Sequence, residues 1–425
     1  MLHIEDAQIR QLLLKGNFGL EKESLRVDEQ GFLSQTRHPF PDDEHIVRDF
    51  CENQTEINTP VTHSAGEAVA CLEHYYRKIQ CGLRQLTPRE YLWPFSNPPY
   101  IRNERDVPIA VFEGEEASKT EYREYLSQRY GRYKMTFSGI HFNFSFAEEL
   151  LQRGFALSGE SDYTEYKNQF YVKLAERAVA YGWLMVAVTA ASPLLDSSFV
   201  EKGRFDQDYF SGMASVRCSE MGYWNHFAPI LDYSNIRAYA DSIRSYVDSG
   251  LLRAPSELYY PIRLKPKGRN VLSVLRDEGV DHIELRMIDV NPLVPCGVDA
   301  RDVSFAQLLL AWLAATPEQP LSVQDQVQAV QNFKSAAHYD LKTVKIVMQD
   351  GRATPVADAA LGVLEQMQEF YRDFPAQVRQ VLDFEKEKFL DAEQRYAWKI
   401  RKAYSGGYVK KGLELAKKRQ EELNV

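Results

Sequence analysis

Hydrophobic and polar residues alternate in several short runs of the chain, and a period of two is typical of half-buried β-strands. The alternation is clearest at Met135–Phe146, where every second residue from Ile140 to Phe146 is isoleucine or phenylalanine. Similar runs predict strands at Gly19–Val27, Glu56–Thr59, Leu258–Leu264 and His282–Val290.

Apolar residues spaced three and four positions apart predict helices between and after these strands. The predicted helices cover Ala65–Leu86, Tyr163–Leu195, Ser234–Ser249, Val303–Ala315 and Pro355–Asp373, and a charged helix or pair of helices follows from Pro375. The strands and helices do not alternate as in parallel α/β folds, and no glycine-rich phosphate-binding motif is complete. We therefore expect an α+β fold with a mostly antiparallel sheet.

The composition is that of a globular protein, because 44% of the 425 residues are hydrophobic. A formal net charge of -9 offers no overall attraction to nucleic acid or to anionic lipid. The uncharged stretch Ala178–Leu195 contains Gly182 and Pro193, so it predicts a buried core helix rather than a membrane span. The five cysteines are scattered and include no C-x-x-C pair, which fits a cytoplasmic protein without a thiolate zinc site.

Two acidic segments are candidates for binding a divalent cation. Glu21 and Glu23 project from the same face of the first predicted strand, and carboxylates this close repel one another unless a cation lies between them. Asp49 and Glu56 follow in the segment 48–60, and hard oxygen ligands of this kind suit Mg²⁺ or Mn²⁺. Each segment alone is also compatible with a solvated strand face or a capped turn.

The predicted strands at 135–146 and 282–290 place polar side chains opposite their apolar residues. His141 faces the same side as Asn143, and Glu284 faces the same side as Arg286. An imidazole can bind a metal or phosphate, a glutamate suits a cation, and arginine binds carboxylate or phosphate bidentately. A structural histidine and a surface ion pair worth about 0–1 kcal/mol are the alternative interpretations.

Two further segments combine arginine with tyrosine, as pockets for amino acids do. The first contains Tyr122 and Arg123 and ends at Gly131, and the second is Ser215–Tyr223, which contains Arg217. Pairs of this kind are also common on ordinary protein surfaces, so each segment alone is weak support for a binding site.

Taken in order, these segments resemble the bacterial glutamate–cysteine ligases, also called γ-glutamylcysteine synthetases. The matching blocks are F-G-L-E-K-E-S-L-R-V, R-D-F-x₅-E-I-N-T-P, Y-R-x₅-R-Y-G, S-G-I-H-F-N-F-S, S-V-R-C-S-E-M-G-Y, Y-Y-P-I-R-L-K and H-I-E-L-R-M-I-D-V-N-P. They run from about Gly19 to about Gly297 and follow the proteobacterial type and the N-terminal half of bifunctional glutathione synthetases. The resemblance implies a glutamine-synthetase-like sheet in a catalytic body at residues 1–300, with a C-terminal helical part at 301–425 packed on the same body.

The resemblance also assigns roles to individual residues. It implies that the ligands of magnesium and of the triphosphate of ATP are Glu21, Glu23, Asp49, Glu56, His141 and Glu284. Arg286 and Arg217 are expected to hold the phosphoryl group or the glutamate, and Tyr260 is expected to contact substrate. The residues implied for the acceptor amino acid are Phe50, Tyr122, Arg123, Met135 and Tyr223.

The implied activity is ATP-dependent joining of the γ-carboxylate of L-glutamate to the amino group of L-cysteine through a γ-glutamyl phosphate. No second ligase half follows in this sequence, so only the first step of glutathione biosynthesis is expected. Met135 stands where the family usually has glutamine, and a thioether suits an apolar side chain. A ligase for a different, apolar acceptor is therefore an alternative, and a non-catalytic binding or regulatory homologue is another.

Overall fold

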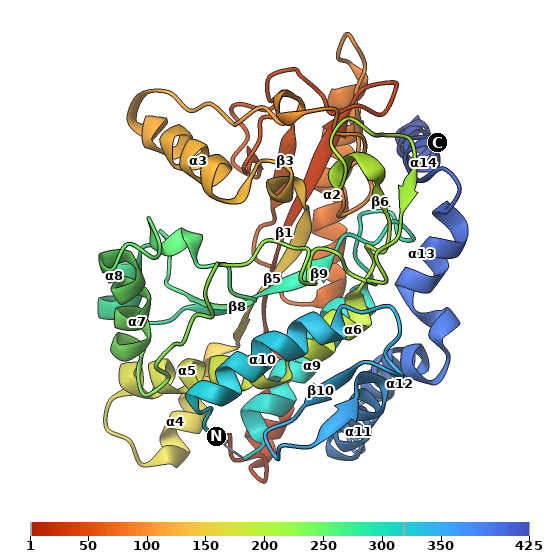
Figure 1. Cartoon of the computed structure of the whole chain (residues 1–425). Coiled ribbons are helices and arrows are strands. Elements are labelled where there is room, and N and C mark those ends of the chain that lie inside the picture. The colour runs from red at the N-terminus through yellow and green to blue at the C-terminus, as the bar shows by residue number, and fades with distance from the viewer. Residues whose placement is uncertain (1, 318, 425) are drawn as a thin grey trace.

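A computed structural model describes residues 2–317 and 319–424, and its centre is an antiparallel sheet (Figure 1). Within the described residues the sheet has seven strands in the order β2-β3-β1-β5-β9-β8, with β4 paired to β1. The strands are β1 Gly16–Val27, β2 Ile46–Arg48, β3 Gln54–Asn58, β4 Tyr91–Leu92, β5 Gly139–Phe146, β8 Ile262–Lys265 and β9 His282–Asp289. The predicted α+β fold with a mostly antiparallel sheet is confirmed.

Helices surround this sheet, and many begin at a side chain that caps the first backbone N–H groups, such as Ser64 and Asp162. The helices are α1 Ala7–Leu12, α2 Ala65–Arg84, α3 Ala117–Tyr130, α4 Glu148–Ser158, α5 Tyr163–Tyr181, α6 Trp183–Thr189, α7 Ile236–Asp248, α8 Leu272–Glu278, α9 Ala300–Ala315, α10 Val323–Ala336, α11 Val356–Phe370, α12 Ala376–Leu390, α13 Tyr396–Tyr404 and α14 Tyr408–Glu421. Two small sheets pair β6 Leu195–Asp196 with β7 Asp208–Tyr209 and β10 Lys345–Val347 with β11 Ala353–Pro355.

The apolar face of the large sheet forms the main core together with α2, α5, α6 and α9. Phe18 of β1 and Phe144 of β5 are at most 1% exposed, and their rings meet edge to face with centroids 5.3 Å apart. The predicted alternation along β5 therefore determines which face of the strand enters the core. The opposite face is left for polar side chains.

Most predicted elements differ from the structure by one to three residues at an end, and three differ by more. The helix predicted at 163–195 is two helices that meet at Gly182, where an added Cβ would lie 2.4 Å from the ring of Phe333. Close packing of α10 against this point explains why glycine interrupts the run. The strand predicted from Met135 begins only at Gly139, and the strand predicted from Leu258 begins at Ile262, directly after Pro261, which lacks a backbone N–H.

The C-terminal helices return to the N-terminal half of the chain. Helix α12 packs on α9 and α11, and α14 packs on β4 and α2. Gln420 of α14 donates hydrogen bonds to the carbonyl oxygens of Gln80 at 3.3 Å and Glu90 at 2.9 Å. Figure 1 shows α13 and α14 along one side of the molecule. The division near residue 300 stays a prediction, because no feature of this packing separates two bodies there.

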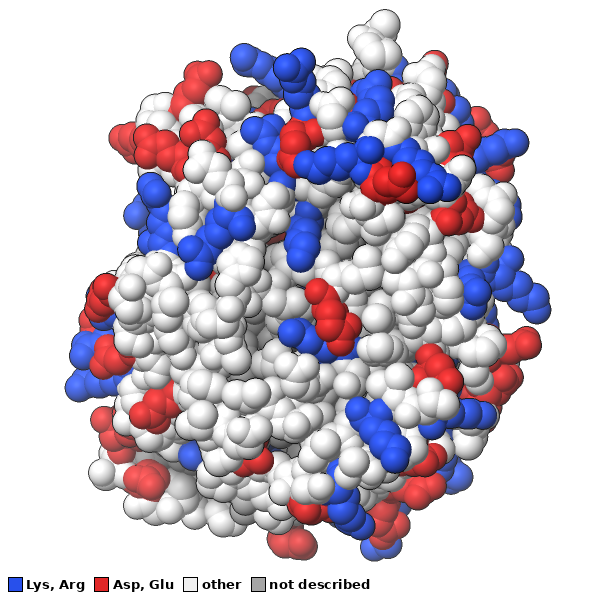
Figure 2. All heavy atoms as spheres, in the orientation of Figure 1, with Lys and Arg blue, Asp and Glu red and all other residues white. Residues whose placement is uncertain are grey.

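The surface does not gather charges of one sign on the face shown in Figure 2, where basic and acidic side chains are interspersed around a broad uncharged area. None of the helices in the described part of the chain combines the length and apolar character needed to cross a bilayer. That the protein binds neither nucleic acid nor membranes stays a prediction.

Candidate active site

Carboxylates from distant parts of the chain converge on the polar face of the sheet. Glu21 of β1 lies opposite His141 of β5, and Glu23 of β1 lies opposite Glu56 of β3. Glu284 of β9 lies opposite Asn143 of β5. Adjacent antiparallel strands thus bring together side chains that are far apart in sequence, since residues directly opposite have Cβ atoms about 4.5–5.5 Å apart.

The first cluster consists of Glu21, His141 and Glu284, which offer ligand atoms within 4.8 Å of one another. His141 Nδ1 lies 2.9 Å from Glu21 Oε2 and 3.9 Å from Glu284 Oε1. Burial and the neighbouring Arg286 lower the pKa of His141, which favours the neutral imidazole that binds metals. Glu284 Oε2 is buried and has no hydrogen-bond partner among the described residues. Two carboxylates, a neutral imidazole and an unpaired buried oxygen fit a divalent cation.

The second cluster consists of Glu23, Asp49 and Glu56. Burial and the charge of Asp49 raise the pKa of Glu23 to about 8, and the same two causes raise the pKa of Glu56 well above its ordinary value. Glu23 Oε2 accepts a hydrogen bond of 2.8 Å from the backbone N–H of Gly139, which fixes its orientation. Their mutual repulsion favours bound protons or a nearby cation. Among the described residues, however, only the first cluster has ligand atoms within 4.8 Å of one another.

Two arginines complete the polar face. Arg286 donates a hydrogen bond of 3.0 Å to Glu284 Oε1. Arg217 is 8% exposed and donates a 2.6 Å bond to the carbonyl oxygen of Arg286. A Cβ on Gly139 would lie 1.9 Å from an Arg217 nitrogen, so only glycine leaves room for this guanidinium. The structure therefore places two cationic side chains beside the acidic clusters, as an anionic substrate requires.

Two lysines of this region were not among the predicted site residues. Lys265 Nζ lies 3.2 Å from Glu284 Oε1. The sequence did contain a signal for Lys265, because this residue alternates with the buried Leu264 along β8. Lys22 lies on the opposite face of the sheet and is 2% exposed, and burial lowers its pKa to about 7. The alternative interpretation of residues 18–27 as a solvated strand face is therefore wrong for Lys22.

A small cavity of about 60 Å³ adjoins the clusters and is bordered by His141, Arg217 and Arg286 together with aromatic side chains. Among these, Tyr223 and Tyr259 meet edge to face with ring centroids 4.8 Å apart. Tyr260 borders the same cavity and is 2% exposed. Tyr259 was not predicted, although it directly precedes Tyr260 in the Y-Y-P block, and its hydroxyl is buried without a partner in the described structure.

The other residues predicted for the acceptor lie at one side of this region. Arg123 of α3 donates a 2.6 Å hydrogen bond to the carbonyl oxygen of Asp49, which ties α3 to the second carboxylate cluster. Burial raises the pKa of Tyr122 to about 12. Phe50 and Met135 are 2% and 7% exposed, belong to one apolar cluster and are not among the side chains that border the cavity. Their contact with a substrate stays a prediction.

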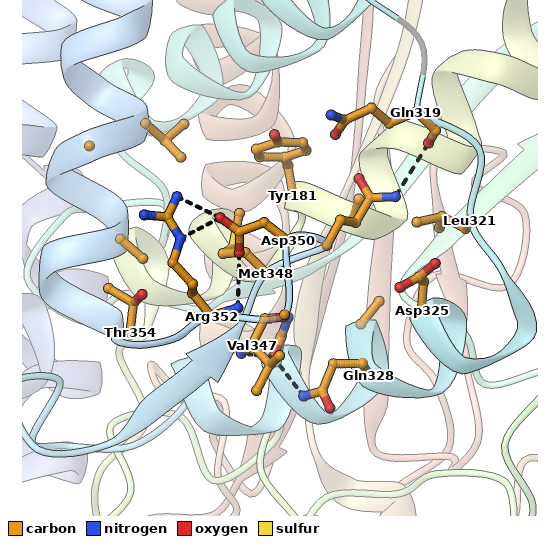
Figure 3. A pocket seen from close by; sticks show the side chains of 18 of the residues that line it. Tyr181, Gln319, Leu321, Asp325, Gln328, Val347, Met348, Asp350, Arg352 and Thr354 are labelled. Carbon is orange, nitrogen blue, oxygen red and sulfur yellow. Dashed lines mark hydrogen bonds and ion pairs between the residues drawn. The ribbon is translucent and has the colours of Figure 1, made fainter.

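A much larger cavity lies elsewhere, between α10, α11 and the β10–β11 hairpin, and measures about 870 Å³. Figure 3 shows that some of its polar side chains are paired, among them Asp350 with Arg352. Arg352 Nε donates to Asp350 at 2.6 Å, and Gln328 donates to the carbonyl group of the Asn332 side chain at 3.0 Å. None of the predicted site residues lines this cavity. Cavity size therefore does not locate the charged clusters.

Comparison with known proteins identifies the family. The glutamate–cysteine ligase family matches residues 1–250 and 228–336. The bifunctional glutathione biosynthesis protein GshAB of Listeria monocytogenes is 34% identical over 98% of this chain and 56% of its own length. GshAB of Clostridium perfringens is 32% identical over 86% of this chain and 48% of its own length. The chain spans about half the length of these curated relatives.

Solved structures support the same fold. A bifunctional glutathione synthetase from Pasteurella multocida is 25% identical, with a TM-score of 0.84 over 99% of this chain and 54% of that one. Glutamate–cysteine ligase from Francisella tularensis, solved in complex with AMP, is 23% identical, with a TM-score of 0.85 over 96% of this chain and 89% of that one. The resemblance found in the sequence motifs is confirmed, and the chain belongs to the glutamate–cysteine ligase family.

Proposed function

We propose that the protein is an ATP-dependent γ-glutamyl ligase that joins the γ-carboxylate of L-glutamate to the amino group of L-cysteine. The observation that carries this proposal is the convergence of two acidic clusters and two arginines on one sheet face, in a chain of this family. The family implies the use of ATP, and the donor atoms of Glu21, His141 and Glu284 fit Mg²⁺.

The proposed reaction has two steps. An oxygen of the glutamate γ-carboxylate attacks the γ-phosphorus of ATP, and ADP leaves, because an unactivated carboxylate resists attack by an amine. The acceptor amine then attacks the carbonyl carbon of γ-glutamyl phosphate, the amine loses a proton, and inorganic phosphate leaves as the isopeptide bond forms. Magnesium, when bound, neutralises the negative charge that spreads over the transferred phosphoryl group.

The side chains of the site have separate tasks in this proposal. Glu21, His141 and Glu284 hold one cation, and Glu23, Asp49 and Glu56 hold further positive charge. Arg286 and Arg217 bind the oxygens of the phosphoryl group or of glutamate, because a guanidinium provides parallel N–H donors that match these anions. Tyr260 contacts substrate beside these arginines. The side of the site that receives the second amino acid is formed by Phe50, Tyr122, Arg123, Met135 and Tyr223.

The identity of that amino acid is the part of the proposal with an alternative. Met135 lies in the same apolar cluster as Phe50 and Tyr130, and its thioether offers little hydrogen bonding to an acceptor side chain. An acceptor with a short apolar side chain is therefore the second candidate. A non-catalytic homologue is disfavoured because all six residues implied as metal ligands are present.

The experiment is an assay of phosphate release with ATP, Mg²⁺ and L-glutamate against a panel of amino acids and small amines, with mass spectrometry of the products. Rapid formation of γ-glutamylcysteine with poor use of apolar acceptors is expected. A better acceptor elsewhere in the panel would keep the mechanism and change the substrate. Absence of glutamate-dependent turnover with every acceptor would refute the ligase proposal. Glu284→Gln serves as the inactive control, since it removes a charge and keeps the shape.

A further inference from the structure

Both carboxylate oxygens of Glu21 contact polar side chains of strand β5. His141 Nδ1 lies 2.9 Å from Glu21 Oε2, and Asn143 Nδ2 donates a 3.0 Å hydrogen bond to Glu21 Oε1. His141 and Asn143 are two residues apart, so they share one face of the strand. The side chain of Glu21 is 25% exposed, so these contacts restrict its rotation. They orient the carboxylate and leave lone pairs on its oxygens for a cation.

Asn143 also contributes an unused acceptor. Its Oδ1 is buried and has no hydrogen-bond partner in the part of the chain that the structure describes. The orientation of the amide is determined by Glu21, because the reverse orientation would place oxygen against oxygen. An acceptor that is buried without a donor is unusual in proteins and points to a ligand at this position.

A second unused acceptor lies beside the first. Asn143 is the direct cross-strand partner of Glu284, and Glu284 Oε2 is also buried without a partner among the described residues. The other oxygen of Glu284 already lies 3.0 Å from Arg286 and 3.2 Å from Lys265. Acceptors on two directly opposed residues therefore have no donor among the described residues. A cation satisfies both at once, because it needs several oxygen ligands.

We propose that Asn143 is a positioning residue for Glu21 and, through Oδ1, a further oxygen ligand of the cation bound by Glu21, His141 and Glu284. This inference rests on the proposed function, because it concerns the same cation. The amide suits the position since it supplies one donor to Glu21 and one acceptor to the ion without adding a third negative charge. An aspartate there would repel Glu21.

The test measures Mn²⁺ binding to the full chain by electron paramagnetic resonance, without nucleotide or glutamate. Asn143→Ala removes both contacts, and Asn143→Ser is a second variant that retains a small hydroxyl. The matched control is Asn17→Ala, because Asn17 lies on the same face of β1 as Glu21. Its side chain donates a hydrogen bond of 3.0 Å to Ser145, outside the cluster. Circular dichroism and thermal unfolding establish that each variant folds.

We expect Asn143→Ala and Asn143→Ser to weaken Mn²⁺ binding at least fivefold, while Asn17→Ala binds as the wild type does. In the ligase assay, the variants should need at least fivefold more Mg²⁺ for half-maximal rate and recover most of kcat at saturating Mg²⁺. Folded Asn143 variants that bind Mn²⁺ less than fivefold more weakly than the wild type would overturn the inference.

The outcome for the proposed function is separate. A wild-type protein that binds Mn²⁺ in an Asn143-dependent manner but forms no glutamyl product would support the inference and refute the ligase proposal. An active wild-type enzyme whose folded Asn143 variants retain full Mn²⁺ affinity would support the ligase proposal and overturn the inference about Asn143. A wild-type protein that binds no Mn²⁺ would overturn the assignment of Asn143.

Discussion

Without a metal, the stability of the fold should decrease as the pH rises, and Glu23 should be a main cause. Its pKa is raised from an ordinary value of 4.5 to about 8, chiefly by burial and secondly by the charge of Asp49. The folded state therefore binds the proton of Glu23 more tightly than the unfolded state. The stabilisation is fully present below pH 4.5 and is lost as the pH rises through 8.

The size of the effect follows from the two pKa values. At about 1.4 kcal/mol per pKa unit, the limiting contribution of Glu23 to the free energy of unfolding is about 5 kcal/mol. Between pH 5 and pH 8 the unfolded state is mostly ionised at Glu23, whereas the folded state holds most of the proton until it is half lost at pH 8. The contribution therefore falls by about 3.5 kcal/mol over this interval. This is a large part of the total stability of a typical domain, which is about 5–15 kcal/mol.

The assay is urea unfolding of the metal-free protein in EDTA at pH 5 and at pH 8, for the wild type and for Glu23→Gln. Glutamine keeps the shape and can still accept the hydrogen bond from Gly139, but it does not ionise. The wild type should lose about 3.5 kcal/mol more than the variant between the two pH values. The control is Glu369→Gln, a solvent-exposed site on α11, which should behave as the wild type. Equal losses in the wild type and Glu23→Gln would refute the reasoning.

Three further substitutions test the site. Arg286→Lys should lower kcat in the phosphate-release assay at least about 100-fold, because an ammonium group does not reproduce the guanidinium contacts, and a near-normal rate would exclude a direct role. Gly139→Ala should displace Arg217, because the added methyl group would overlap the guanidinium. We expect the free energy of unfolding to fall by about 1–3 kcal/mol and turnover to be abolished. A variant with wild-type stability and rate would contradict the close contact. Met135→Gln should shift acceptor preference towards cysteine in a competition assay if the natural acceptor is apolar, and an unchanged ranking would eliminate this position as a determinant.

The strands that build the site could be predicted because their periodicity and their chemistry coincide. In β5 the residues Phe142 and Phe144 are fully buried, so the position of His141 on the polar face follows from a period of two. The same argument places Glu284 on the polar face of β9. Matching motifs then indicated which strands contribute to one site, which periodicity alone does not determine.

Other features depend on contacts between distant segments and could not be predicted from local patterns. Lys22 is buried because α2 covers that face of β1, with Lys22 Nζ 4.9 Å from the ring centroid of Tyr76. Gly182 ends α5 because Phe333 of α10 packs against it. To predict the burial of Lys22 and the end of α5, one must know which helix packs against each position. Local periodicity does not carry this information.

The return of α14 to the first third of the chain has a consequence for biosynthesis. Gln420 bonds to Glu90 across 330 residues, and Gly412 lies so close to Trp93 that an added Cβ would be 2.4 Å from its ring. At translation rates of about 5–20 residues per second, roughly 15 to 65 seconds separate the synthesis of these partners. During that interval the aromatic surface around Trp93 has no α14 to cover it, so this apolar surface is exposed to aggregation or to chaperone binding while the chain is being synthesised.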